Sequence, residues 1–272
     1  MADTGVRYRL GVIGTGVMGR ALLNAAIRGG VVKASEVIAS DVSPSCRLEA
    51  EKLGCDATDD NVQVVENAEH ILVAVKPRVI PEVLGSLRHH LREGQLLVSI
   101  AAGVPIATLR EAAGDSPAIV RVMPNICCTV NQAASAWAAG PGVTDEQREF
   151  VAGLLEAAGE AVSVEEKLID AVTGLSGSGP AFAAMFIEAL ADGGVKAGLS
   201  REQAQRLAAQ TVLGAAQWVL DNDAGPARLK DLVSSPGGTT ITGVAALESR
   251  AFRSAVIEAV VAAAARAREL GD

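Results

Sequence analysis

Residues 10–19 read Leu-Gly-Val-Ile-Gly-Thr-Gly-Val-Met-Gly, an apolar run that passes directly into a Gly-x-Gly-x-x-Gly sequence. The apolar run predicts a buried strand, and the residues after it have the pattern of a helix. In such a unit Gly14 makes the tight turn, Gly16 lets a pyrophosphate approach the backbone and Gly19 allows close helix–strand packing. The amides at the helix N-terminus then bind the anion. A glycine-rich turn without a ligand is the alternative, but the strand before it and the helix after it favour a dinucleotide site.

Asp41 ends the next predicted strand, at the spacing of about 20 residues that places an acid on the adenosine ribose of NAD. Ser43, Ser45 and Arg47 follow, and hydroxyls with an arginine are what the 2′-phosphate of NADP would need. Asp41 as a cap for a helix starting at Pro44 is the alternative. The sequence therefore leaves the choice between NADH and NADPH open.

Short strand patterns alternate with helices for the first 163 residues, which is typical of a parallel α/β sheet of the Rossmann type. After Glu165 only Ala- and Leu-rich helical patterns follow, so we expect a dinucleotide-binding domain over 1–164 and an all-helical domain over 165–272. The predicted strands are 8–13, 36–40, 70–75, 95–100, 118–122 and 133–137, with helices starting near 18, 44, 81, 106 and 144. The later helices are predicted at 178–197, 200–222, 226–233, 240–248 and 252–270.

Composition excludes several classes of function. A formal net charge of −8 argues against a nucleic-acid partner, whose phosphates need a basic face. No apolar run reaches the roughly 18 residues of a membrane span, and the N-terminus has no signal-peptide core, so we expect a cytoplasmic protein without a membrane partner. The four cysteines and three histidines show no metal-ligand spacing, so we expect no metal site and no histidine catalysis.

Further loops at predicted strand ends converge on the crevice where open α/β sheets bind ligands. Ala74-Val75-Lys76-Pro77 brings a cation beside the dinucleotide, although a lone lysine is more often a solvated loop residue. Ala101-Ala102-Gly103 is small enough for a nicotinamide ring to lie over the backbone, and Met123-Pro124-Asn125 ends the following strand.

Two stretches in the helical half are unusual. Residues 172–181 place three glycines and a proline at a helix start, and residues 230–240 join a helix end to a hydroxyl-rich turn and a new helix. Amides of that turn, with the hydroxyls of Ser235, Thr239 and Thr240, form a receptor for a small carboxylate. The alternative is a plain N-cap formed by Thr239 or Thr240.

Taken together, these motifs resemble pyrroline-5-carboxylate reductase, along nearly the whole chain. The resemblance is carried by GTGVMG at 14–19, AVKP at 74–77, SIAAGV at 99–104, MPN at 123–125, DAVTGLSGSGPAF at 170–182, EALADGGVKAGL at 188–199 and LKDLVSSPGGTTI at 229–241.

The resemblance implies reduction of the cyclic imine 1-pyrroline-5-carboxylate to L-proline by hydride transfer from NADPH or NADH. Thr240 would lie nearest the ring nitrogen and orient it, since a hydroxyl is too weak an acid to act alone. The resemblance also implies a homodimer that assembles into a ring such as a decamer. Besides Asp41, the implied dinucleotide contacts are Gly14, Thr15, Gly16, Val17, Met18, Gly19, Asn61, Ala74, Val75, Lys76, Pro77, Ala101, Ala102 and Gly103, and the implied substrate contacts are Glu166, Ser235, Gly237, Gly238, Thr239 and Thr240.

The chain departs from the family pattern at three places. Ile126-Cys127-Cys128 replaces the usual Thr-Pro after MPN, Asp41 stands where many relatives have serine or threonine, and Leu232 replaces a polar residue. Two other functions are weighed against reduction of the imine. A β-hydroxyacid dehydrogenase would need a catalytic lysine, for which Lys196 is the candidate, and a dinucleotide sensor would bind the cofactor without turnover.

Overall fold

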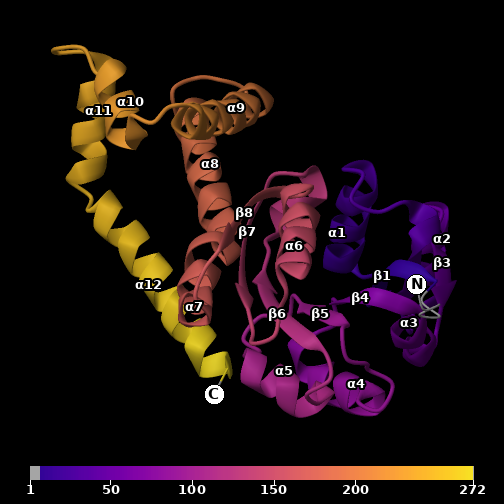
Figure 1. The fold of residues 1–272 in the computed structure, drawn as a ribbon. Coiled ribbons are helices and arrows are strands. Elements are labelled where there is room, and N and C mark those ends of the chain that lie inside the picture. The colour runs from indigo at the N-terminus through magenta and orange to yellow at the C-terminus, as the bar shows by residue number, and fades with distance from the viewer. Residues whose placement is uncertain (1–6, 272) are drawn as a thin grey trace. The chain divides into compact units, whose positions relative to one another are not determined.

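The computed structural model describes residues 7–271, which form two compact units (Figure 1). The first unit runs to Ser178 and includes the end of the chain from Ala262, and the second is Gly179–Val261. This division differs from the predicted boundary at Val164. The reason is that Ile169 is buried in the core of the first unit and keeps the segment after Val164 with the sheet.

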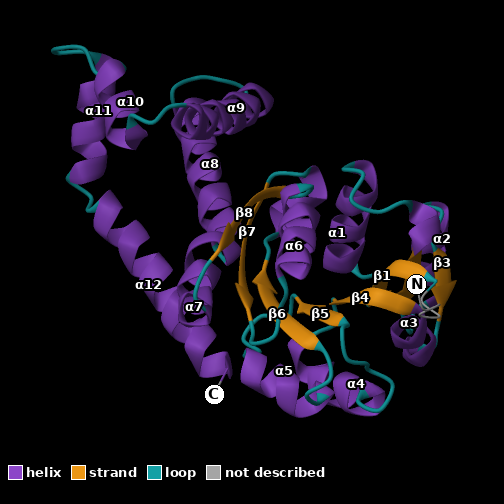
Figure 2. Cartoon of the chain, viewed as in Figure 1, coloured by secondary structure: helices purple, strands orange, loops and turns teal. Residues whose placement is uncertain are grey.

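One eight-stranded sheet forms the centre of the first unit, in the order β3-β2-β1-β4-β5-β6-β7-β8 (Figure 2). The first six strands run parallel, β7 is antiparallel to β6, and β8 is parallel to β7. All six predicted strands are confirmed, whereas β3 and β8 were not predicted. The strands are β1 Tyr8–Ile13, β2 Val37–Ser40, β3 Asp56–Thr58, β4 Ala68–Val73, β5 Leu96–Ser99, β6 Ala118–Met123, β7 Ala133–Ala139 and β8 Gly159–Ser163.

Helices cover both faces of this sheet because its strands are apolar on both sides. Leu10 and Val12 pack against α1, α2 and α6, while Ile13 and Ile71 pack against α3, α4, α5 and α7. These helices are α1 Val17–Arg28, α2 Pro44–Lys52, α3 Asn61–Asn67, α4 Ile80–Leu87, α5 Ile106–Ala113, α6 Asp145–Glu156 and α7 Ile169–Val172. Neither α3 nor α7 was predicted.

The second unit is helical, as predicted, and its own core is small. Three alanines, Ala191, Ala204 and Ala208, form its buried centre between α8 and α9, and the rings of Phe186 and Phe252 lie 5.7 Å apart. Its helices are α8 Gly179–Lys196, α9 Arg201–Asp221, α10 Gly225–Leu232, α11 Thr239–Glu248 and the first part of α12 Phe252–Gly271. Within residues 7–271, no helix has the length and apolar character needed to cross a membrane.

Candidate active site

The loop between β1 and α1 has the geometry that its glycines predict. Gly14 has φ +94°, and its amide donates to the carbonyl of Ser40 at 2.8 Å. A Cβ on Gly14 would lie 2.8 Å from the carbonyl oxygen of Ala74, and one on Gly19 would collide with the carbonyl of Gly14. At Gly16, the N-cap of α1, nothing lies within 4 Å of an added Cβ. The fold thus needs glycine at positions 14 and 19, where a side chain would collide. Gly16 has no such neighbour, and it leaves the N-terminus of α1 open to a ligand.

A groove of about 430 Å³ lies along this loop at the carboxyl ends of β1, β2 and β4. This is the edge at which open α/β sheets bind dinucleotides. The sequence-predicted residues that the groove brings together are Gly14, Gly16, Asp41, Asn61, Ala74, Val75 and Lys76. The other predicted cofactor residues do not line it; Ala101, Ala102 and Gly103 follow β5, the neighbour of β4 in the sheet.

The carboxylate of Asp41 joins the glycine loop to the end of β2. Oδ2 accepts the main-chain N–H of Thr15 at 2.8 Å, and Oδ1 accepts that of Ser43 at 2.8 Å. Ser43, not Asp41, is the N-cap residue of α2. Arg47 is also bound to main chain, since its Nη1 donates to the carbonyl of Asp41 at 2.8 Å. Asp41 therefore has a structural function in addition to any contact with a ribose.

Asn61 and two cations complete the groove. The side-chain oxygen of Asn61 accepts the hydroxyl of Ser40 at 2.6 Å, so Nδ2 is the part of the amide left to donate elsewhere. Lys76 and Arg78 are both exposed and both line the groove. Sequence reasoning missed Arg78. Its position directly after the Lys76-Pro77 pair at a strand end was the signal that could have found it.

Glu166, which the resemblance assigns to the substrate, lies in the first unit and contacts the start of α5. Its Oε1 accepts the amide of Ile106 at 2.6 Å, so it satisfies one of the unpaired N–H groups of that helix. The buried Arg121 on β6 lies 3.5 Å from Glu166 and donates to Asp170 at 3.0 Å. Arg121 and Glu166 thus fix the helix that follows the loop at 101–105.

The MPN segment and the glycine-rich stretch at 172–181 meet in the first unit. The side-chain amide of Asn125 donates to the carbonyl of Ser176 at 3.0 Å, and Gly177 packs against Met123 so closely that a Cβ would lie 2.5 Å from its Cε. Residues Thr173–Gly177 form a π-helical turn, a distortion that is frequent at functional sites.

Cys128, one of the residues that departs from the family pattern, is buried beside Met18, with 3.9 Å between the two sulfur atoms. Burial raises the pKa of its thiol, so the side chain stays neutral and packs as a small apolar group.

The turn between α10 and α11 lies in the second unit, and its Gly238 amide donates to the carbonyl of Ser235 at 3.0 Å. Gly237 has φ +67°, and Gly238 is the N-cap residue of α11 without a side-chain hydrogen bond. Thr239 and Thr240 are the first two residues of the helix, so neither is its cap and the alternative interpretation is wrong. Within the described chain their hydroxyls make no hydrogen bond, whereas that of Thr242 donates to the carbonyl of Gly238 at 3.0 Å.

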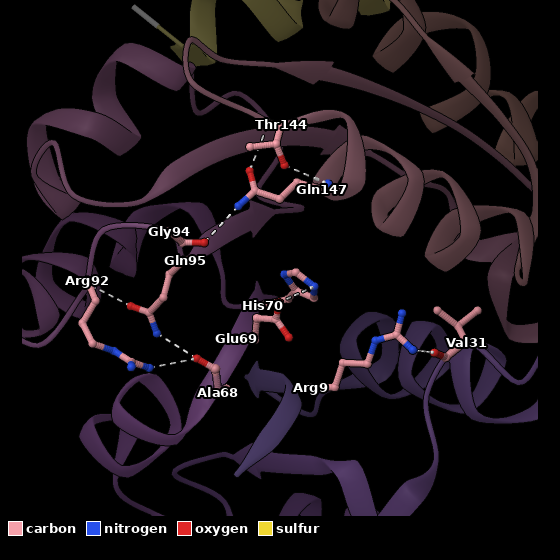
Figure 3. A network of polar contacts seen from close by, with 10 residues as sticks. All are labelled: Arg9, Val31, Ala68, Glu69, His70, Arg92, Gly94, Gln95, Thr144 and Gln147. Carbon is pink, nitrogen blue, oxygen red and sulfur yellow. Dashed lines mark hydrogen bonds and ion pairs between the residues drawn. The ribbon is translucent and has the colours of Figure 1, made fainter. Parts of the chain in front are cut away.

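A second hollow, of about 690 Å³, lies at the amino ends of β4, β5 and β6, whereas the cofactor groove lies at the carboxyl ends of the strands. His70 lines it, surrounded by the polar network of Figure 3, in which Gln147 donates to the carbonyl of Gly94 at 3.0 Å. Burial, with a smaller effect from Arg9, lowers the pKa of His70 to about 4. Its Nδ1 is buried without a hydrogen-bond partner among the described residues, and its ring packs against that of Phe150, with 3.9 Å between the ring centres.

Two family models match the chain, one near its start and one over its second part. The family model for pyrroline-5-carboxylate reductase dimerisation matches residues 166–270, and the model for coenzyme F420-dependent NADP oxidoreductase matches residues 9–103. The chain is 47% identical to the pyrroline-5-carboxylate reductase of Methanosarcina acetivorans over 81% of its length and 82% of that protein. It is 50% identical to that of Synechocystis, over 78% of this chain and 79% of the relative.

Solved structures give the same result. The reductase from Coxiella burnetii is 34% identical with a TM-score of 0.92, covering 98% of this chain and 99% of that one. The reductase from Plasmodium falciparum, solved with NADP bound, is 32% identical with a TM-score of 0.86, covering 98% of this chain and all of that one. These relatives favour a reductase over the hydroxyacid dehydrogenase and the dinucleotide sensor. The chain belongs to the pyrroline-5-carboxylate reductase family.

Proposed function

We propose that this chain reduces 1-pyrroline-5-carboxylate to L-proline with NADPH or NADH, by hydride transfer to the carbon of the cyclic imine. The observation that supports this most is the groove beside Gly16, which leaves the N-terminus of α1 open to an anion in a chain of this family. The nicotinamide, when bound, supplies the hydride.

The chain's own residues fit the dinucleotide. The amides of 14–19 would bind the pyrophosphate, while Asn61 and Lys76 supply donors from the facing loops. Ala101–Gly103 would lie against the nicotinamide. Glu166 would act by fixing the start of α5, directly after that loop, because its Oε1 is already held by the amide of Ile106.

The turn at 235–240 is proposed to hold the substrate. Its amides and the hydroxyls of Ser235 and Thr239 would bind the carboxylate, at a helix N-terminus that favours negative charge. The hydroxyl of Thr240 would donate to the ring nitrogen and orient it. A protonated imine is already electrophilic, so orientation at near-attack distance is the main requirement and no strong base is needed.

The homodimer is proposed from the exposed apolar surface of the second unit. Leu213, Leu220 and Val261 are each more than half exposed, and a three-alanine core is too small to order five helices alone. Assembly of dimers into a ring such as a decamer is proposed with it. Size-exclusion chromatography with light scattering tests both, and a well-behaved monomer would disprove them.

A coupled assay tests the reaction. The purified chain is mixed with 1-pyrroline-5-carboxylate and either NADPH or NADH, while loss of absorbance at the nicotinamide band and formation of proline are followed. Proline formed in step with cofactor oxidation is the expected result. Tight cofactor binding without turnover would instead support the sensor, and oxidation of 3-hydroxyacids the dehydrogenase. A cytoplasmic location stays a prediction, which cell fractionation tests.

A further inference from the structure

Two cations in the cofactor groove have no partner in the described chain. Lys76 and Arg78 follow β4 on either side of Pro77, and both are exposed. The Lys76 carbonyl accepts the amide of Val79 at 3.0 Å, but neither side chain makes a hydrogen bond or ion pair among residues 7–271. The carboxylates of Asp41 and Glu82 line the same groove, so its fixed charges sum to zero. The summed charge of the groove therefore does not repel a ligand that carries one phosphate group more.

The residues that the sequence suggests for the adenosine ribose are engaged elsewhere. Asp41 uses both carboxylate oxygens on the amides of Thr15 and Ser43, and Arg47 donates to the carbonyls of Asp41 and Val42. Arg47 is also absent from the groove wall, whereas Arg78 is on it. Of the two arginines, Arg78 is the one available to a ligand in the groove.

Arg78 shares the groove with the residues at the carboxyl end of β2. In this fold the adenosine ribose lies at the carboxyl end of β2, where Val42 is 91% exposed and lines the groove together with Arg78 and Val79. A guanidinium can bind a phosphate through two parallel hydrogen bonds and can stack on an aromatic base, which a lysine cannot do as well. Lys76 follows Val75, the residue whose Cγ1 would lie 3.0 Å from a Cβ on Gly14, and its ammonium is a point charge without the fork of a guanidinium.

We propose that Arg78 is the residue that selects NADPH, by binding the 2′-phosphate of its adenosine ribose. The inference rests on the proposed function, because it assigns a contact within the proposed cofactor site. It places the residue that attracts the 2′-phosphate on the loop after β4, whereas Asp41 at the end of β2 can only repel that phosphate.

Calorimetric titration of the full-length chain with 2′,5′-ADP and with 5′-AMP tests this without turnover. These fragments differ only in the 2′-phosphate. The wild type should bind 2′,5′-ADP at least about tenfold more tightly, the range expected for a hydrogen bond to a charged group. Arg78→Gln should bring the two affinities within about twofold. Lys76→Gln is the matched control and should leave their ratio unchanged.

Equal affinities in the wild type, or an unchanged ratio in Arg78→Gln, would overturn the assignment. The ratio of kcat/KM for NADPH to that for NADH should fall in parallel in Arg78→Gln. Failure of the proposed function is distinguishable, because it would appear as absence of proline formation with both cofactors in the wild type, whatever the fragments show.

Discussion

The Thr240→Val variant tests whether the hydroxyl of Thr240 acts in catalysis or only stabilises the fold. Valine keeps the shape of threonine, and in the structure Thr240 is the second residue of α11, where the N-cap residue is Gly238. Because no described protein group accepts or donates to the Thr240 hydroxyl, its loss should change the free energy of unfolding by less than about 0.5 kcal/mol. If the hydroxyl donates to the imine nitrogen in the transition state, its loss should cost about 2–3 kcal/mol, or roughly 30- to 150-fold in kcat and kcat/KM.

The measurement is steady-state turnover of 1-pyrroline-5-carboxylate at saturating cofactor, together with thermal unfolding of both proteins. Thr242→Val is the matched control, since the hydroxyl of Thr242 donates to the Gly238 carbonyl on the same helix. The control should lose up to about 1 kcal/mol of stability while its turnover stays near normal. Normal turnover in Thr240→Val would refute the proposed contact, and loss of cofactor binding would assign the turn to the dinucleotide instead.

Three further predictions concern the first unit. Asp41→Ser should raise the preference for NADPH over NADH about tenfold, if ~1.4 kcal/mol of repulsion of the 2′-phosphate is relieved. The same change should weaken the binding of both cofactors, because the Thr15 amide loses its acceptor. An unchanged ratio of kcat/KM values for the two cofactors would leave Asp41 with a structural function alone. Arg121→Met should lower the free energy of unfolding in urea by about 2–3 kcal/mol, since it removes the buried cation that pairs with two partly buried carboxylates, and Arg121→Lys should recover part of that loss. The pKa of His70 is about 4 in the folded chain, against 6.5 for an unperturbed histidine, so the unfolded chain binds the proton first as the pH falls. The free energy of unfolding should therefore decrease by about 3 kcal/mol between pH 6.5 and pH 4. His70→Phe should abolish this decrease, and identical pH profiles for the two proteins would contradict the prediction.

The sequence predicted the buried apolar strands and the longer helices, and missed β3, β8, α3 and α7. β1 was predicted with its observed bounds, because its residues 10–13 are all buried and form an uninterrupted run without a polar side chain. β3 has three residues and lies at the sheet edge, so it carries too little pattern to be recognised. The antiparallel direction of β7 was not predicted either. It follows from the short connection after Met123, since parallel neighbours need a crossover of a dozen or more residues.

The site was predicted at the level of loops but not of individual bonds. The loops after β1, β2 and β4 could be placed together because carboxyl ends of parallel strands share one edge. The contact of Glu166 with the Ile106 amide joins residues 60 positions apart, and no local pattern encodes such a pair. The bonds of Asp41 to Thr15 and Ser43 are equally invisible, since its spacing from the glycine loop suits a ribose contact as well as a structural one.

In the proposed dimer, the helical unit would link assembly to catalysis. Its proposed substrate turn begins α11, a helix with no buried residue, and the exposed side chains around it include Leu232, Val233 and Leu247. An element that buries nothing within its own chain gains little order from folding alone, because ordering each residue costs conformational entropy of about 1–2 kcal/mol. A partner that covers these apolar residues would stabilise the ordered turn by mass action, and that free energy would rise with the logarithm of the partner's concentration. If substrate binds to that turn as proposed, the same linkage would tighten the association of the proposed subunits.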